Sequence, residues 1–290
     1  MSHIEVKACQ LREEAKRRVK SASFLQNLFS KSVNKTKESI EYYKRAGNLF
    51  KVVKNWNQAG IAFTDAANLC CKANDFTEAA LNFVEAAHCY KKIDTLKAIE
   101  IYQEVVKIYR NNGKFSAAAQ YYQAIGELLL DDGDNEDAIK YFEEAAVFYK
   151  HENRYTAANK CLEKIADFAA LSSDYLKAIK IFEELACFDL ASSIIKHQVK
   201  YYLFKAAICL LCIDTKAARK LVIYINMYPA FEESIEYQLI LCLLKCIMDN
   251  DIEGFEKSVR TFDKVNELSQ WHVTLLLRIK NQIEIEYTLV

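Results

Sequence analysis

Small and aromatic residues alternate along the middle of this chain in a pattern that returns about every twenty residues. Each unit has an aromatic residue, then a small pair, then a second aromatic residue or leucine, and then another small pair. Further copies begin near residues 96, 115, 136, 155 and 175. The two most regular copies are Trp56, Ala59, Gly60, Phe63, Ala66 and Ala67, and Phe76, Ala79, Ala80, Phe83, Ala86 and Ala87.

Within each unit the apolar positions recur at i, i+3, i+4 and i+7, which is typical of a helix buried along one face. Twenty residues hold one helix of about fifteen residues and a short turn, so consecutive helices should run antiparallel. The small pairs allow two helix axes to approach within about 8–10 Å. Polar turn residues at 72–75, 111–114, 131–134 and 172–174 fit helix caps and stops. The pattern predicts helical hairpins of the tetratricopeptide kind, with a somewhat longer repeat.

The period fades after residue 186, where the predicted helices vary in length and are richer in Leu and Ile. These segments are 198–213, 215–227, 231–248, 251–264 and 271–286. The sequence therefore predicts an all-α protein with two parts. Residues 1–186 would form a right-handed, tetratricopeptide-like stack of antiparallel hairpins, and residues 187–290 a C-terminal helical bundle.

Composition supports this fold class. The 290 residues are 52% hydrophobic, which argues against disorder, and include only one proline and six glycines. Lys and Arg balance Asp and Glu at 39 each, but the charges are unevenly distributed. Residues 1–60 hold thirteen basic residues against five acidic ones, whereas 127–137 hold six acidic residues and no basic one. Such polarity can steer an acidic partner or an anionic membrane toward the N-terminal part.

The N-terminal segment is polar and no stretch approaches about 18 uninterrupted apolar residues, so we expect neither a signal peptide nor a spanning helix. Ten cysteines in such a chain are expected to be reduced thiols of a cytosolic protein.

Two constellations that resemble metal sites are better explained by packing and capping. Cys209 with Cys212, and Cys242 with Cys246, lie among Leu and Ile without the turn residues of a zinc site. The acidic run at 132–136 lacks the glycine that a calcium loop needs at its sixth position, and helix N-terminal capping explains it better. Without a phosphate-binding loop or a catalytic triad, we expect neither an enzyme nor a cofactor.

Four segments go beyond a generic repeat. They read KNWNQAGIAF at 54–63, AANKCL at 157–162, YLFKAAICLLCID at 202–214 and QWHVTLLLRIK at 270–280. Together they resemble the soluble NSF attachment proteins, particularly the alpha/beta type, and the similarity runs the whole length of the chain.

The resemblance implies an adaptor without catalytic chemistry. Several copies would surround a SNARE four-helix bundle, of syntaxin-type, synaptobrevin-type and related chains, whose surface is predominantly acidic. They would recruit and stimulate the NSF-type hexameric AAA+ ATPase, which disassembles the bundle in vesicle fusion and trafficking. Such a protein would be cytoplasmic and peripheral on the cytosolic face of membranes.

The resemblance also suggests candidate contacts. An apolar loop at 22–33 would attach to membranes through Phe24, Leu25, Leu28 and Phe29, because large apolar residues in a loop expose area unless they insert into something. The alternative is that they pack inside the first hairpin. The chain end would stimulate the ATPase through Leu289 with Glu284 and Glu286, although the acidic stretch is shorter than in the family. Without the resemblance, this end would be expected to fray.

Basic residues matching the family's SNARE-binding positions are Lys51, Lys54, Lys91, Lys92, Lys114, Lys160, Lys164 and Lys200. A lone surface lysine is ordinarily only solvated, and Lys160 is the strongest single candidate. Gln120 and Ile235 stand where the alpha type carries Lys and Arg, so the binding face would be weaker, shifted or tuned to other SNAREs. Two alternative interpretations remain: a generic tetratricopeptide scaffold for short peptides, and a gamma-type branch of the same family.

Overall fold

The computed structural model describes the backbone of residues 2–24, 29–191, 196–213 and 218–288, and the side chains of residues 2–21, 34–191, 198–213 and 220–283. Every regular element in these ranges is a helix. The chain divides into two compact units, unit 1 at Met1–Ala158 and unit 2 at Asn159–Val290. The all-α prediction is confirmed, while the change of architecture after residue 186 stays a prediction about where the repeats end.

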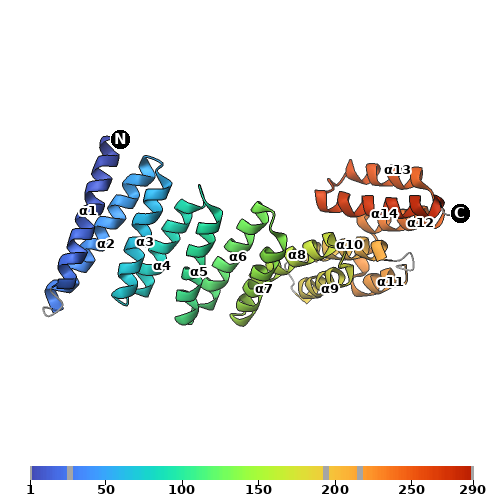
Figure 1. Ribbon diagram of the computed structural model, residues 1–290. Coiled ribbons are helices and arrows are strands. Elements are labelled where there is room, and N and C mark those ends of the chain that lie inside the picture. The colour runs from blue at the N-terminus through green and yellow to red at the C-terminus, as the bar shows by residue number, and fades with distance from the viewer. Residues whose placement is uncertain (1, 25–28, 192–195, 214–217, 289–290) are drawn as a thin grey trace. The chain divides into compact units, whose positions relative to one another are not determined.

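Unit 1 is a row of antiparallel helices, and each helix packs on the next in sequence. Figure 1 shows them side by side, from blue α1 to green α7. The predicted repeat starts coincide with the helix starts within one residue. The helices are α1 (His3–Phe24), α2 (Phe29–Val52), α3 (Trp56–Lys72), α4 (Phe76–Tyr90), α5 (Thr95–Asn111), α6 (Phe115–Asp132), α7 (Asn135–His151) and the start of α8 (Tyr155–Leu171).

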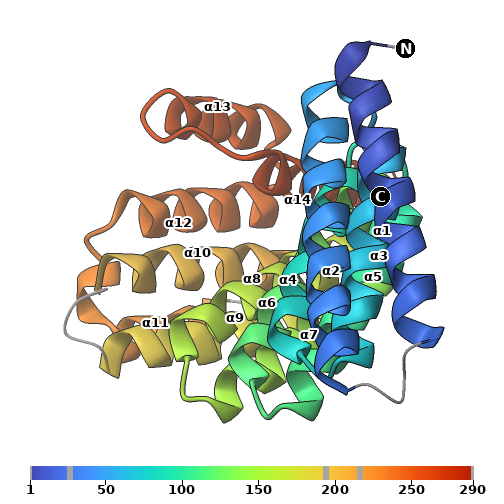
Figure 2. The same ribbon diagram turned by 90° about the vertical axis from the view of Figure 1, so that its left-hand side faces the viewer.

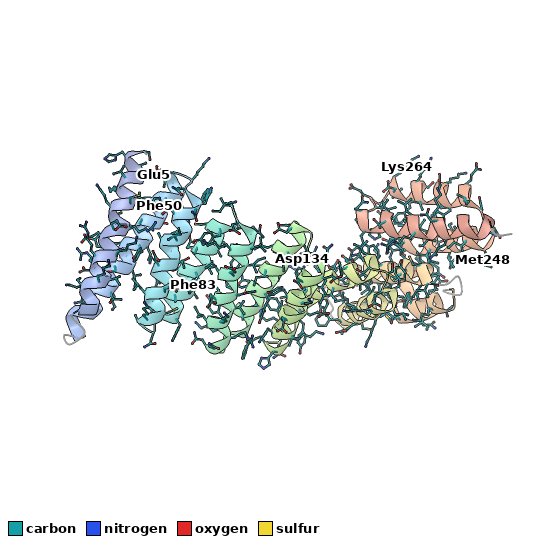
Figure 3. All side chains as sticks on the ribbon, viewed as in Figure 1. Glu5, Phe50, Phe83, Asp134, Met248 and Lys264 are labelled. Carbon is teal, nitrogen blue, oxygen red and sulfur yellow. The ribbon has the colours of Figure 1, made fainter. Side chains whose placement is uncertain are left out.

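The small pairs lie where neighbouring helices cross. Both alanines of most pairs are fully buried, and large aromatic side chains such as Phe50 and Phe83 fill the next turn (Figure 3). Gly60 is the tightest case, because a Cβ atom there would lie 2.6 Å from the ring of Tyr90. Such an approach between helices is open only to glycine.

Turn chemistry fixes where the helices begin. The side chains of Asn55, Asp75, Asp94 and Asp134 each accept a hydrogen bond from the backbone N–H three residues later. Each satisfies a donor that the first helical turn leaves without a partner. Asp134 therefore caps α7, as the capping interpretation of the acidic run predicted.

The first hairpin has longer helices than the sequence indicated. A loop was expected over 22–33, but α1 continues to Phe24 and α2 already begins at Phe29. Residues 1–46 contain no glycine or proline. Both helices can therefore continue into the segment that was expected to be a loop.

Unit 2 holds the rest of α8 and six further helices. Its core is continuous around α10, which contacts α9, α12 and α14, and Figure 2 shows α12 lying between α10 and α13. The helices are α9 (Tyr175–Ala191), α10 (Lys196–Ile213), α11 (Ala218–Met227), α12 (Ile235–Met248), α13 (Ile252–Asp263) and α14 (Gln270–Thr288). Helix α12 starts later than predicted because Pro229 opens a short 3-10 turn and Ser234 caps α12.

The Gly60 contact leads to a stability prediction. Gly60→Ala should lower the stability of unit 1 by about 1–3 kcal/mol, because the new methyl group displaces the Tyr90 ring. Hydrogen–deuterium exchange should show faster exchange in α3 and α4, with the amides of unit 2 as an internal control. Combining it with Tyr90→Leu, which makes room, should cost less than the sum of the two changes, and strict additivity would refute the proposed clash.

Candidate functional site

Four of the predicted SNARE-binding lysines gather along one edge of unit 1. In the view of Figure 1, the α2–α3, α4–α5 and α6–α7 turns form an upper edge, and the intervening turns form a lower edge. Lys51 and Lys54 lie at the first of the upper turns, and Lys91 and Lys92 at the second. Four of the predicted lysines thus lie at two turns of the same edge.

These lysines are not equivalent. Lys51 is bound to Glu85 at 2.6 Å and lies 5.6 Å from the centre of the Phe63 ring. Lys54, Lys91 and Lys92 are exposed and have no ion pair among the residues that the structure describes. We call these three the basic edge patch. It remains available for an acidic partner, whereas part of the Lys51 charge is already used within unit 1.

The upper edge changes sign at its third turn. Asp131, Asp132 and Asp134 lie there, and Thr95 of the preceding upper turn reaches Asp132 with a 3.5 Å hydrogen bond. The acidic run of the sequence therefore sits on the same edge as the basic edge patch. An acidic partner would be attracted to one end of this edge and repelled from the other.

The remaining predicted lysines lie elsewhere. Lys114 precedes α6 at the lower edge. Lys160 and Lys164 are exposed on α8 in unit 2, and Lys200 of α10 is 3.6 Å from the carboxylate of Glu236. The structure thus brings together the four lysines of the upper edge, places Lys114 at the lower edge of unit 1, and assigns the other three to unit 2.

Sequence reasoning missed one basic residue in unit 1. Arg154, just before α8, lines a cavity of about 460 Å³ together with Gln120 and Gln123 of α6. It is exposed and has no ion pair among the side chains described. Gln120 is the position where the alpha type carries Lys, and Arg154 adds a positive charge to the same cavity, whose lining also includes Glu127. Gln120 and Arg154 are far apart in sequence, so only the packing of the helices shows that they line the same cavity.

Unit 2 contains a cluster of ionisable residues that resembles a catalytic site in composition. The Lys205 ammonium group is 2.8 Å from Asp167 and 3.4 Å from Glu163. It also lies over the rings of Tyr201 and Trp271, at 4.5 and 5.1 Å from their centres. Lys205 is only 2% exposed, so a substrate has no access to its amine.

The pKa values of the two closest charged groups are shifted by burial and by their contacts. Burial raises the pKa of Asp167, and the Lys205 ammonium partly offsets that rise. Burial works to lower the pKa of Lys205, but the contacts with Asp167 and Tyr201 together outweigh it, and the pKa lies above its usual value. The Asp167 side chain is 25% exposed, so the pair is only partly buried, and removing either partner costs stability.

Neighbouring His272 is neutral. It is 6% exposed, its Nδ1 shares a 2.7 Å hydrogen bond with Ser269, and burial together with Lys205 lowers its pKa to about 4. The cluster of Lys205, its carboxylates and His272 therefore holds α8, α10 and α14 together and has the geometry of a structural element.

The cysteines are free thiols, and most serve as packing residues. Cys209, Cys212 and Cys246 are buried in the core of unit 2, on the helices predicted for them, whereas Cys242 is exposed on α12. Among the described residues, no group of three or more His, Cys, Asp or Glu side chains is arranged to hold a metal ion.

The two end sites lie outside the described side chains. This applies to Phe24, Leu25, Leu28 and Phe29 near the first turn, and to Glu284, Glu286 and Leu289 at the chain end. Within the described ranges, no helix combines the length and the apolar character needed to cross a membrane.

A row of helical hairpins with a charged edge, joined to a rigid helical bundle, defines a scaffold that binds other proteins. A family model described as "Soluble NSF attachment protein, SNAP" matches residues 6–284. The chain belongs to the soluble NSF attachment protein family.

Similar proteins agree with this assignment. The alpha-soluble NSF attachment protein of Homo sapiens is 40% identical over 283 residues, covering 97% of this chain and 96% of that protein. The beta-soluble NSF attachment protein of Bos taurus is 39% identical, covering 97% and 95%. A probable vesicular-fusion protein sec17 homolog of Schizosaccharomyces pombe is 32% identical, covering 87% and 88%.

The buried His272 should make the stability of unit 2 depend on pH. Its pKa falls from 6.5 to about 4 on folding, so its stabilising effect is complete above pH 6.5 and is lost as the pH falls toward 4. Between pH 7 and pH 5 this loss should be about 2 kcal/mol.

Trp271 is a local probe of this effect, because Trp56→Phe removes the other of the two tryptophans. Urea unfolding followed by Trp271 fluorescence should show the loss, and His272→Asn, which cannot titrate, should reduce it by most of that amount. Equal pH dependence in both proteins would contradict the assignment.

Proposed function

We propose that this protein is an adaptor that binds assembled SNARE bundles and attaches the NSF-type AAA+ ATPase to them, so that the bundles are disassembled during vesicle fusion. Membership of the attachment protein family supports this role most directly. In this proposal the chain supplies binding surfaces and the ATPase supplies the chemistry.

The basic edge patch is the observation that carries the proposal in molecular terms. Lys54, Lys91 and Lys92 are exposed and have no ion pair among the described residues, so an acidic helical bundle can meet them without first breaking internal contacts. The acidic turn beside them repels the same partner and favours one orientation on the upper edge. Lys160 and Lys164 offer a second set of charges on unit 2.

Both ends of the chain have proposed roles. Phe24, Leu25, Leu28 and Phe29 insert into the surface of a membrane, which raises the local concentration of the adaptor near membrane-anchored SNAREs. Leu289, with Glu284 and Glu286, contacts and stimulates the ATPase. Several copies surround one bundle, and the protein works as a peripheral component on the cytosolic face of membranes.

The decisive experiment measures disassembly of SNARE bundles by the ATPase, with the bundles free in solution or anchored in liposomes. Lys54→Glu/Lys91→Glu/Lys92→Glu should weaken binding to the bundle at least about tenfold, through lost attraction and added repulsion. Lys180→Glu/Lys220→Glu/Lys264→Glu changes the net charge equally at exposed lysines of unit 2 outside the predicted set, and should bind like the wild type.

Two further variants separate the end sites. Serine at positions 24, 25, 28 and 29 should slow disassembly only on liposomes, whereas deletion of residues 289–290 should slow it in both settings. If the wild type neither binds the bundle nor recruits the ATPase, the adaptor function is refuted. A peptide-binding scaffold would then be the better description.

Arg154 provides a second, sharper test. We expect Arg154→Ser to weaken binding to the SNARE bundle about threefold to tenfold, because it removes a charge that no described residue neutralises. Gln120→Lys lines the same cavity and should restore most of the lost affinity in the double variant. Unchanged binding by Arg154→Ser, while the wild type still binds, would show that Arg154 lies outside the contact.

A further inference from the structure

The upper edge of unit 1 carries opposite charges on two neighbouring turns. Lys91 and Lys92 lie at the α4–α5 turn, and the next turn of this edge, between α6 and α7, is acidic over residues 131–137 (Figure 1). The side chains of Thr95 and Asp132 are 3.5 Å apart, so the two turns adjoin. The proposed contact with a SNARE bundle uses only the basic turn of the two.

The α4–α5 turn has an excess of positive charge. Its one carboxylate, Asp94, accepts a 3.0 Å hydrogen bond from the backbone N–H of Lys97 and so caps α5. The Lys97 ammonium group lies 4.4 Å from the centre of the Tyr90 ring. Lys91 and Lys92 are exposed, and neither has an ion pair among the residues described. Their two charges are therefore not neutralised within the turn.

The α6–α7 turn has an excess of negative charge. Asp137 is paired with Lys140 at 2.6 Å. The other four acidic residues are exposed, and in the part of the chain that the structure describes none of them has an ion pair. They are Asp131, Asp132, Asp134 and Glu136. We call residues 131–137 the acidic turn.

Exposed apolar side chains lie between the two groups of charges. Ile93 is 51% exposed and Leu96 is 70% exposed. Leu96 follows Thr95, whose hydroxyl group reaches the acidic turn, and Ile93 follows Lys92. Along this edge the order is therefore basic, apolar and acidic. Large apolar side chains gathered on an exposed edge are typical of a contact with another molecule.

A surface with this order of groups is complementary to itself. When a second copy is turned by 180° about an axis near Leu96, the acidic turn of each copy faces Lys91 and Lys92 of the other. The apolar side chains of the two copies then meet near the axis. Each contact occurs twice, as in every two-fold interface between identical chains.

We propose that two copies of this protein pair through the upper edge of unit 1 in this two-fold arrangement. A flat anionic membrane fits this edge less well, because it would meet the acidic turn together with the lysines. A second copy of the chain satisfies both groups of charges and covers Ile93 and Leu96.

The size of the contact predicts a weak dimer. With helix axes about 8–10 Å apart, two adjacent turns cover roughly 20 by 20 Å, or about 800 Å² buried over both copies. Stable interfaces between proteins bury about 1,200 Å² or more. We therefore expect a dissociation constant on the order of 100 μM at low salt, which rises as salt screens the charges.

Pairing covers Lys91 and Lys92, which also belong to the basic edge patch. A second copy and a SNARE bundle would then compete for the same lysines, and this consequence rests on the proposed function. The pairing itself does not rest on it, because it involves this chain alone. Adding SNARE bundles should dissociate the dimer, and a bundle that binds the intact dimer would contradict the shared use of these lysines.

Sedimentation velocity of the full-length protein tests the pairing. At a protein concentration of about 200 μM and a salt concentration of about 50 mM, more than half of the copies should be dimeric. At about 500 mM salt the protein should be largely monomeric. Leu96→Ser should raise the dissociation constant at low salt about tenfold, because each copy loses its apolar contact near the axis.

An exchange of charges identifies the surface. Lys91→Glu/Lys92→Glu and Asp131→Lys/Asp132→Lys should each be monomeric, because each edge then carries charges of one sign. An equimolar mixture of the two variants should form dimers again, since both contacts then join opposite charges. Lys180→Glu/Lys220→Glu changes the net charge as much as the first variant does, at exposed lysines of unit 2, and should remain dimeric.

Three results would overturn the proposal. A wild type that stays monomeric at low salt would exclude the dimer. Unchanged dimers in both charge variants would place the pairing on another surface, and a mixture that stays monomeric would contradict the two-fold arrangement. Binding of SNARE bundles by a strictly monomeric wild type would leave the adaptor function in place, so the two hypotheses can fail independently.

Discussion

The close approach of neighbouring helices in unit 1 is the constraint on which the rest of that unit depends. Gly60 leaves space for the Tyr90 ring, and Gly126 does the same for Phe142. Each helix packs mainly on its neighbours in the row, so small residues are needed at successive crossings. A single larger residue would separate one pair of helices and shift the turns that carry the charges.

Helix capping sets the positions of the turns that carry the charged residues of the upper edge. Asn55, Asp94 and Asp134 fix the starts of three helices, so their turns lie in line along the upper edge. The basic edge patch and the acidic turn then follow one another at defined positions. An elongated, charged partner can contact such an edge over several hairpins. A compact pocket offers no contact surface of that length.

The helices of unit 2 are held together by a different kind of interaction. They are held by an ion pair between the buried Lys205 ammonium group and the partly exposed Asp167 carboxylate, with aromatic rings against the cation. A pair of this kind favours one arrangement of the helices, because any alternative leaves the buried charge without its partner. The α12–α13 hairpin, by contrast, keeps an open groove lined by apolar residues, two lysines and two aspartates. One unit thus combines a rigid core with an uncovered surface.

The sequence alone determined the helices of the repeat, since the small pairs and caps are local signals that act within about twenty residues. Its resemblance to the family also predicted the lysines that would bind a SNARE bundle. Only the tertiary structure decided which charges act together: Lys54 and Lys91 share an edge, Lys51 is bound to Glu85, and Arg154 lies beside Gln120. These relations join residues separated by tens of positions, and a local pattern carries no information about which helices pack side by side.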